Sequence, residues 1–126
     1  MEILTAASLS GRNRASSWND LCATRLGRSD FEPRDPDFDA ELRFTRLGPM
    51  SIACLALSPG TIDRSTRHIG EAPLRTWNLV LQLRGRSELS HYGHQSALET
   101  GDLVLMDHAA PFTFRLEDPA ALLILR

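Results

Sequence analysis

The second half of the chain alternates hydrophobic and polar residues in short runs, separated by glycine and proline turns. In residues 77–85, WNLVLQLRG, the apolar side chains occupy every second position: Trp77, Leu79, Leu81 and Leu83. A period of two is typical of a half-buried β-strand, so we expect this apolar set to face the core. Further short runs follow at residues 86–92, 95–100, 103–107, 112–116 and 121–126. Turn signals about every 8–12 residues favour a β-sandwich or barrel over alternating strands and helices.

The first half adds three predicted strands. Residues 41–47 alternate, with Leu42 and Phe44 on one face, and residues 50–58 are more continuously apolar, as an inner strand would be. Residues 61–69 also alternate, which places on one side Ile62, Arg64, Thr66 and His68. We expect residues 69–75 to form the connection to the strand at 77–85.

A short helix is predicted near the N-terminus. Ser16 and Ser17 are suitable N-cap residues, and Gly27 is suited to end the helix after Leu26. The apolar residues of this segment fall on one helical stripe: Trp18, Leu21, Cys22 and Leu26. We expect the stripe to lie on the barrel or over its mouth.

Two segments show no regular pattern. Residues 1–15 are polar and small, and we interpret them as a flexible N-terminal arm. Residues 28–41 contain two prolines and six acidic residues, which predicts a solvated loop anchored by Phe31 and Phe38.

Composition narrows the function classes. The chain has 126 residues, 42% of them hydrophobic, and a formal net charge of −2, which fits one soluble domain. Direct DNA binding normally needs a basic surplus, so this balance argues against it. No apolar run is long enough to cross a bilayer, and the N-terminus does not read as a signal peptide. We therefore expect a cytoplasmic protein with no membrane partner and two reduced cysteines.

The order of motifs resembles that of cupin barrels. These proteins carry a strand, a glycine turn, a second strand pair and a tight Gly-Asp turn, which here is Leu98-Glu99-Thr100-Gly101-Asp102. Glycine suits the tight backbone turn, and the short Asp102 side chain can hold it. The resemblance implies an all-β fold: a cupin-like double-stranded β-helix, or jelly-roll barrel, with one short N-terminal helix.

The wider arrangement resembles the amino-terminal effector-sensing domain of AraC/XylS-type transcription regulators. The motifs that carry this likeness span residues 16–126 and are Ser17-Trp18, Phe38 to Leu42, Leu47-Gly48, Arg64 to His68 and Gly101 to Asp107. The resemblance implies a cupin-like effector-binding domain at residues 16–126 that follows the arm at 1–15. Its implied partner is a small-molecule effector; a homodimer is allowed, and DNA would be reached only through a C-terminal helix-turn-helix domain that this sequence does not contain.

The sequence gives little support for a catalytic site or a metal site. Metal cupins use a His-x-His pair with a downstream Glu, whereas the corresponding stretch here offers one histidine, His68. The later ligand position falls at Phe112, or at best at the neighbouring His108. His91 and His94 flank a turn and need not converge. Neither cysteine has a histidine nearby in sequence. We therefore expect no catalytic residue, no metal and no cofactor, and no enzyme.

An effector pocket inside the barrel would be lined by inward-facing side chains. Our candidates are Phe44, Ile52, Arg64, Trp77, Leu79, Leu81 and Phe114. A buried guanidinium needs a partner, so Arg64 could pair with an anionic or hydroxylated ligand. Two alternatives stay open: a stand-alone cupin enzyme, metal-dependent or an isomerase, and a non-catalytic interaction barrel whose apolar residues are plain core.

Overall fold

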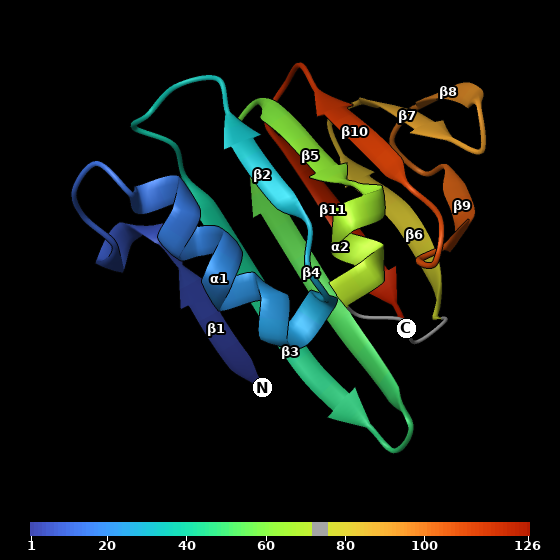
Figure 1. Cartoon of the computed structure of the whole chain (residues 1–126), viewed down its shortest axis with the longest axis horizontal. Helices are drawn as coiled ribbons and strands as arrows, with labels where there is room; N and C mark the ends of the chain where they lie inside the picture. The colour runs from blue at the N-terminus through green and yellow to red at the C-terminus, as the bar shows by residue number, and fades with distance from the viewer. Residues whose placement is uncertain (72–75) are drawn as a thin grey trace.

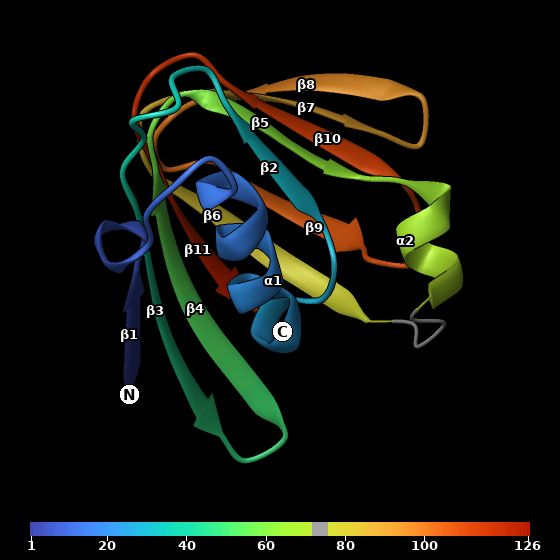
Figure 2. The ribbon, with the colours of Figure 1, turned by 60° about the vertical axis from the view of Figure 1, so that its left-hand side comes forward.

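The computed structural model describes residues 1–71 and 76–126, and within them two antiparallel sheets lie face to face (Figures 1 and 2). One sheet, the β6 sheet, contains in spatial order β1 (Glu2–Thr5), β3 (Ala40–Leu47), β4 (Met50–Leu57), β11 (Ala120–Leu125), β6 (Trp77–Arg84) and β9 (Leu103–Asp107). The other, the β10 sheet, contains β2 (Asp30–Pro33), β5 (Gly60–Arg64), β10 (Phe112–Leu116), β7 (Ser87–His91) and β8 (His94–Leu98). The fold is therefore all-β and cupin-like, as expected, with the sheets forming an open sandwich.

The described residues also form a 3-10 turn η1 (Ala6–Ser8), α1 (Arg14–Leu26) and α2 (Thr66–Glu71). Helix α1 lies at the open side of the sandwich, between β3 of one sheet and β2 of the other (Figure 2). It begins two residues before the predicted Ser16, and its N-cap Asn13 makes no side-chain capping hydrogen bond. It ends as predicted at Gly27, whose φ of 78° suits glycine and whose N–H donates to the Ala23 carbonyl oxygen.

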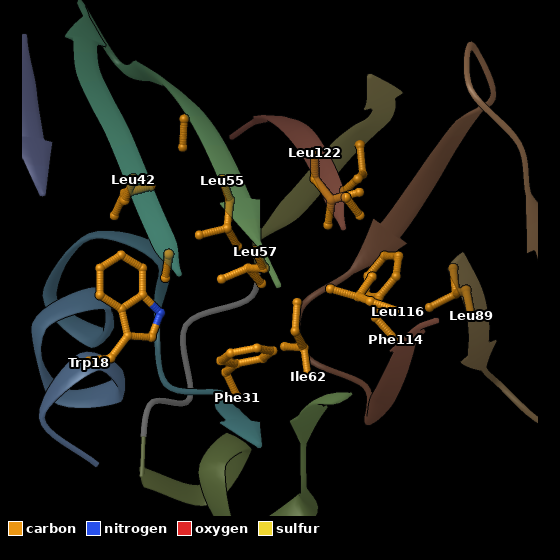
Figure 3. Packing of buried hydrophobic residues seen from close by; sticks show 14 of the residues in the cluster. Trp18, Phe31, Leu42, Leu55, Leu57, Ile62, Leu89, Phe114, Leu116 and Leu122 are labelled. Atoms are coloured by element: carbon orange, nitrogen blue, oxygen red, sulfur yellow. The ribbon is translucent and has the colours of Figure 1, made fainter. Parts of the chain in front are cut away.

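The core fills the space between the sheets. Side chains from the β6 sheet, among them Leu42, Leu55 and Leu122, point toward Ile62 and Phe114 of the β10 sheet (Figure 3). Trp18, 1% exposed, enters the same core from α1, so the predicted helical stripe does pack against the sheets. Burying such a large ring between the sheets stabilises the position of α1.

The Gly-Asp turn has the structure that its sequence predicted. Gly101 has a φ of 96°, and its N–H donates to the Gln82 carbonyl oxygen on β6. Asp102 Oδ2 accepts a hydrogen bond of 2.8 Å from the Glu99 N–H, which closes the turn. This turn fixes where β8 gives way to β9.

The N-terminal segment is not a flexible arm. β1 pairs with β3 along its whole length, and Glu2 forms a salt bridge with Arg25 of α1, Oε2 to Nη2, at 2.8 Å. Ala6 is fully buried, and its carbonyl oxygen accepts a hydrogen bond from Arg14. Backbone pairing thus orders a stretch whose side chains show little pattern.

Residues 28–41 are likewise more regular than expected, because β2 occupies their first part. β2 is an edge strand that pairs only with β5, and an edge can accept Pro33 since no second partner needs its missing N–H. Phe31 and Phe38 are buried in contact with each other, which agrees with their predicted role as anchors.

The strand predicted at 61–69 is too long. β5 ends at Arg64, and α2 begins at Thr66. Ser65 caps this helix: its Oγ accepts from the His68 N–H, and its own N–H donates to His68 Nδ1. Thr66 and His68 therefore do not share a strand face with Ile62. The predicted connection at 69–75 begins inside α2, and residues 72–75 lie outside the described part of the chain.

The face of β6 is the opposite of the predicted one. Asn78, Val80 and Gln82 point into the sandwich, while Trp77 and Leu79 are 49% and 36% exposed on the outer surface. Gln82 is fully buried and satisfied, since its Nε2 donates to the Arg84 carbonyl oxygen and its Oε1 accepts from Ser87. A satisfied amide can occupy an inner position that sequence periodicity assigns to leucine.

Candidate functional site

A cavity lies between the two sheets, at the end where the last turn of α1 approaches the C-terminal residue. Both sheets and α1 supply its walls: Leu26, Ser29, Leu55, Ile62, Asn78, Val80, Met106, His108, Phe112, Phe114, Leu122, Ile124 and Arg126. Its open space is about 50 Å³. Because one water needs about 10–15 Å³ measured in this way, the cavity holds only a few waters as it stands.

Asn78 places an unsatisfied polar atom against this cavity. The residue is 9% exposed, and its Oδ1 has no hydrogen-bond partner among the described residues. Almost all buried side-chain polar atoms in proteins are hydrogen-bonded, and leaving one unpaired costs about 1–3 kcal/mol. Gln82, four residues further along the same face of β6, is fully paired. The Oδ1 atom of Asn78 is therefore free to accept a hydrogen bond from a bound molecule.

Positively charged groups gather at the same end of the sandwich. Arg126 lines the cavity, and its Nη1 donates to the Arg25 carbonyl oxygen in the last turn of α1 at 3.2 Å. Arg64 is 3% exposed, and its guanidinium donates to the carbonyl oxygens of His108 and Arg28. Of these three carbonyl groups, that of Arg25 is in the last turn of α1, where the helix leaves its carbonyl groups without a partner in the helix.

Burial and two nearby arginines keep the His108 imidazole neutral. Burial, followed by repulsion from Arg64 and Arg126, lowers the pKa of His108 to about 3, although Asp107 acts in the opposite direction. Desolvation and the Arg126 charge also lower the pKa of Arg64. The end of the cavity is thus an electropositive region with one neutral imidazole in its wall.

Gly27 makes the close approach at this end possible. A Cβ at this position would lie 2.9 Å from His108 Cε1 and 3.2 Å from Arg126 Nη2. Together with the positive φ of Gly27, this means that only glycine lets α1 end directly against the two cavity side chains.

The seven predicted pocket residues fall into three groups. Phe114 lines the cavity, and Arg64 is buried beside it through the His108 carbonyl contact. Phe44 is buried in the core but does not line the cavity. The other four belong to the outer face of the β6 sheet and cannot reach the cavity: Ile52, Trp77, Leu79 and Leu81.

Those four residues extend an apolar outer surface. The register places Leu79 beside Leu105 of β9 and beside Leu125 of β11, and it places Leu81 beside Leu103. Leu103 and Leu105 are 60% and 61% exposed. β6 is thus a strand with alternating residues, as predicted, but its leucines lie on the outer face of the sheet and not in the core.

Sequence reasoning missed Asn78 and Arg126, and it considered His108 only as a possible metal ligand. Asn78 stood on the polar side of the β6 alternation, which we assigned to solvent. A comparison with the run LVLMD at residues 103–107 could have identified it. In the sheet, the leucines of that run lie beside Leu79 and Leu81 on the outer face, so Met106 and its partner Asn78 face inward.

The remaining chemistry is sparse. Within residues 1–71 and 76–126, no three His, Cys, Asp or Glu side chains are placed to hold a metal ion. Burial raises the pKa of the Cys22 thiol to about 12, so this cysteine is protonated and unreactive near neutral pH. None of the helices in the described segments is both long and apolar enough to span a bilayer.

Comparison with solved structures supports the fold. The structure of the AraC-like transcriptional activator CuxR superposes with a TM-score of 0.80 at 22% identity, covering 98% of this chain and 46% of that chain. The EutQ protein of Clostridium difficile gives 0.55 at 11% identity, covering 75% and 71%. A cupin-2 domain from Rhodospirillum rubrum gives 0.53 at 16% identity, covering 77% and 68%. Identities this low show a shared fold alone, and the chain spans less than half the length of CuxR.

Comparison of the sequence with protein families is more specific. No curated protein sequence matches the chain. The family described as the AraC-binding-like domain matches residues 18–126, from the core tryptophan of α1 to the cavity arginine after β11. The match covers most of the chain and every described strand of the two sheets except β1. The chain therefore belongs to the AraC-binding-like domain family and has a cupin-like fold.

Proposed function

We propose that this domain senses a small effector for an AraC-family transcription regulator, and that the effector binds in the cavity between the sheets. The observation that carries the proposal is the unpaired Oδ1 of Asn78, buried at a cavity wall that is mostly apolar. A few fixed polar groups in an apolar pocket are what a specific small-molecule site contains. The family membership supports the same function.

Binding would require the cavity to enlarge, because about 50 Å³ does not hold an effector of several heavy atoms. The contact between Arg126 and the Arg25 carbonyl oxygen closes the cavity end beside α1. An effector that enters would displace this contact and shift α1 relative to β11. Ligand binding would then select one of two arrangements of the helix and the strand end.

The signal would pass to a DNA-binding domain elsewhere in the protein. More than half of CuxR lies outside the part that matches this chain. The cavity wall includes Arg126, which directly follows β11, so a domain joined there would be covalently close to the bound effector. The protein would act in the cytoplasm and would be a sensor rather than an enzyme.

The test is a thermal-shift screen of aromatic acids, amines and sugars against the wild-type domain and Asn78→Leu. A ligand at 100 times its Kd stabilises the folded state by about 2.7 kcal/mol, which is a clear shift for a domain of this size. We expect at least one compound to raise the Tm of the wild type and to act much less on the variant. Equal shifts for both proteins, or no shift from the whole set, would refute the proposal.

A further inference from the structure

The cavity end carries two positive charges, those of Arg64 and Arg126. Among the described residues, neither Arg64 nor Arg126 lies within salt-bridge distance of a carboxylate, whereas Arg25, Arg28, Arg43, Arg86 and Arg115 all do. Arg64 and Arg126 are also close enough to each other for the charge of Arg126 to depress the pKa of Arg64. Exposed arginines such as Arg12 and Arg34 also lack a carboxylate partner within the described residues, but water solvates their charge. Arg64 differs because it is 3% exposed, and Arg126 differs because it lines the cavity.

Both guanidiniums also have donors to spare. A guanidinium offers five N–H groups. Arg64 uses two nitrogens, on the carbonyl oxygens of His108 and Arg28, and Arg126 uses one, on the Arg25 carbonyl oxygen. These carbonyl contacts fix the position of each group without neutralising it. The Arg126 guanidinium is therefore held at the cavity wall with donors available for an acceptor.

The rest of the wall suits a hydrocarbon body. Phe112 and Phe114 lie edge to face with their ring centroids 5.8 Å apart. Ile62 on the adjacent strand β5 and Leu122 on β11 of the opposite sheet complete this part of the wall. Such a surface favours a flat or short apolar group. It disfavours a phosphate ester, since a second negative charge would have to be desolvated beside these side chains.

We propose that the effector is a small carboxylic acid whose carboxylate pairs with Arg126 and whose apolar body contacts Phe112 and Phe114. Arg64 supplies a second positive charge behind His108, and the Asn78 amide receives a polar substituent of the same molecule. Arginine binds carboxylate through two parallel hydrogen bonds, which fixes orientation as well as charge. The inference rests on the proposed function and adds the chemical class of the effector to it.

The test compares matched compounds that differ in charge. Isothermal titration with the wild-type domain would use benzoate, benzamide and benzylamine, and in parallel butyrate, butyramide and butylamine, at fixed ionic strength. We expect at least one acid to bind ten or more times tighter than its amide and its amine. In Arg126→Gln the acid should lose that advantage while the amide keeps its affinity, and Arg126→Lys should recover part of it, because lysine restores the charge but not the two-pronged geometry.

Two controls separate a binding defect from a folding defect. Arg86→Gln removes an exposed arginine in the β6–β7 turn and should leave every affinity unchanged. Circular dichroism and Tm should show that Arg126→Gln is folded. An amide that binds as tightly as its acid, an acid that binds Arg126→Gln as tightly as the wild type, or binding of amines alone would overturn this inference and leave the effector site standing. A cavity that takes no compound of any charge would overturn the proposed function and this inference with it.

Discussion

The side-chain amide of Asn19 forms two hydrogen bonds with the backbone of Phe31. Its Nδ2 donates to the Phe31 carbonyl oxygen at 3.1 Å, and its Oδ1 accepts from the Phe31 N–H at 2.8 Å. Because β2 is an edge strand, this amide takes the place of a neighbouring strand at that residue. It therefore joins α1 to the β10 sheet.

Replacing this amide should destabilise the domain. Asn19→Ala leaves two buried backbone groups unpaired, and we expect the free energy of unfolding to fall by about 2–4 kcal/mol. Urea denaturation followed by circular dichroism would measure it. Asn13→Ala is the matched control, since Asn13 is exposed and makes no capping bond, and it should change stability by less than about 0.5 kcal/mol. Equal effects of the two substitutions would contradict this role.

Asn78 and Gln82 should respond in opposite ways to the same substitution. Asn78→Leu removes an unsatisfied buried oxygen, so we expect the ligand-free domain to gain about 1–2 kcal/mol. Gln82→Leu strands its partners Ser87 and Arg84 and should cost a similar amount or more. The Tm values of the two variants provide the check. A loss of stability in Asn78→Leu would mean that the amide is already satisfied in solution.

The stability of the domain should depend on pH through His108. Its pKa is about 3 in the folded state, owing first to burial and then to Arg64 and Arg126, against 6.5 when unperturbed. Between these values the unfolded chain binds a proton that the folded protein does not bind. This contribution is fully present above pH 6.5 and is lost as the pH falls toward 3.

The free energy of unfolding, measured at pH 7 and at pH 5, would show whether His108 takes up this proton on unfolding. We expect the wild type to lose about 2 kcal/mol more than His108→Gln over that interval, as an upper bound set by about 1.36 kcal/mol per pKa unit. His94→Gln, which alters an exposed histidine, should follow the wild type. Parallel curves for the wild type and His108→Gln would show that His108 is not held neutral by the fold.

Adjacent residues of β9 should differ sharply in their contribution to stability. Met106 is 2% exposed in the core and Leu105 is 61% exposed on the outer face. We expect Met106→Ala to cost about 2–5 kcal/mol and Leu105→Ala less than about 1 kcal/mol. Chemical denaturation of both variants would check the assignment of the two faces. The opposite ranking would mean that Leu105 faces the core and Met106 faces outward.

Local signals in the sequence were sufficient for most strands. The positive φ of Gly101 and the side-chain bond of Asp102 depend on residues within a few positions, so the turn could be predicted from its own letters. The stripe that carries Trp18 could be predicted for the same reason, because helical spacing alone puts it on one face. The fold class followed from the number and spacing of such turns.

Inner and outer faces depend on partners that are distant in sequence. Gln82 is tolerated inside because Ser87 and the Arg84 carbonyl oxygen satisfy it, and nothing in WNLVLQLRG states this. The alternating run after Ile62 bends into a helix because Ser65 and His68 exchange hydrogen bonds, a cap that the strand pattern concealed. Arg126 was missed because its role depends on α1, about a hundred residues earlier.

The closed state of the cavity affects measured affinity. If the space near Asn78 opens in only a fraction of the molecules, the apparent Kd of any effector is its intrinsic Kd divided by that fraction. A domain that is open about 1% of the time would then bind about a hundredfold more weakly than its contacts allow. Substitutions that loosen the link between Arg126 and the Arg25 carbonyl oxygen, such as a change at Gly27, would alter affinity by changing this population, without touching the effector.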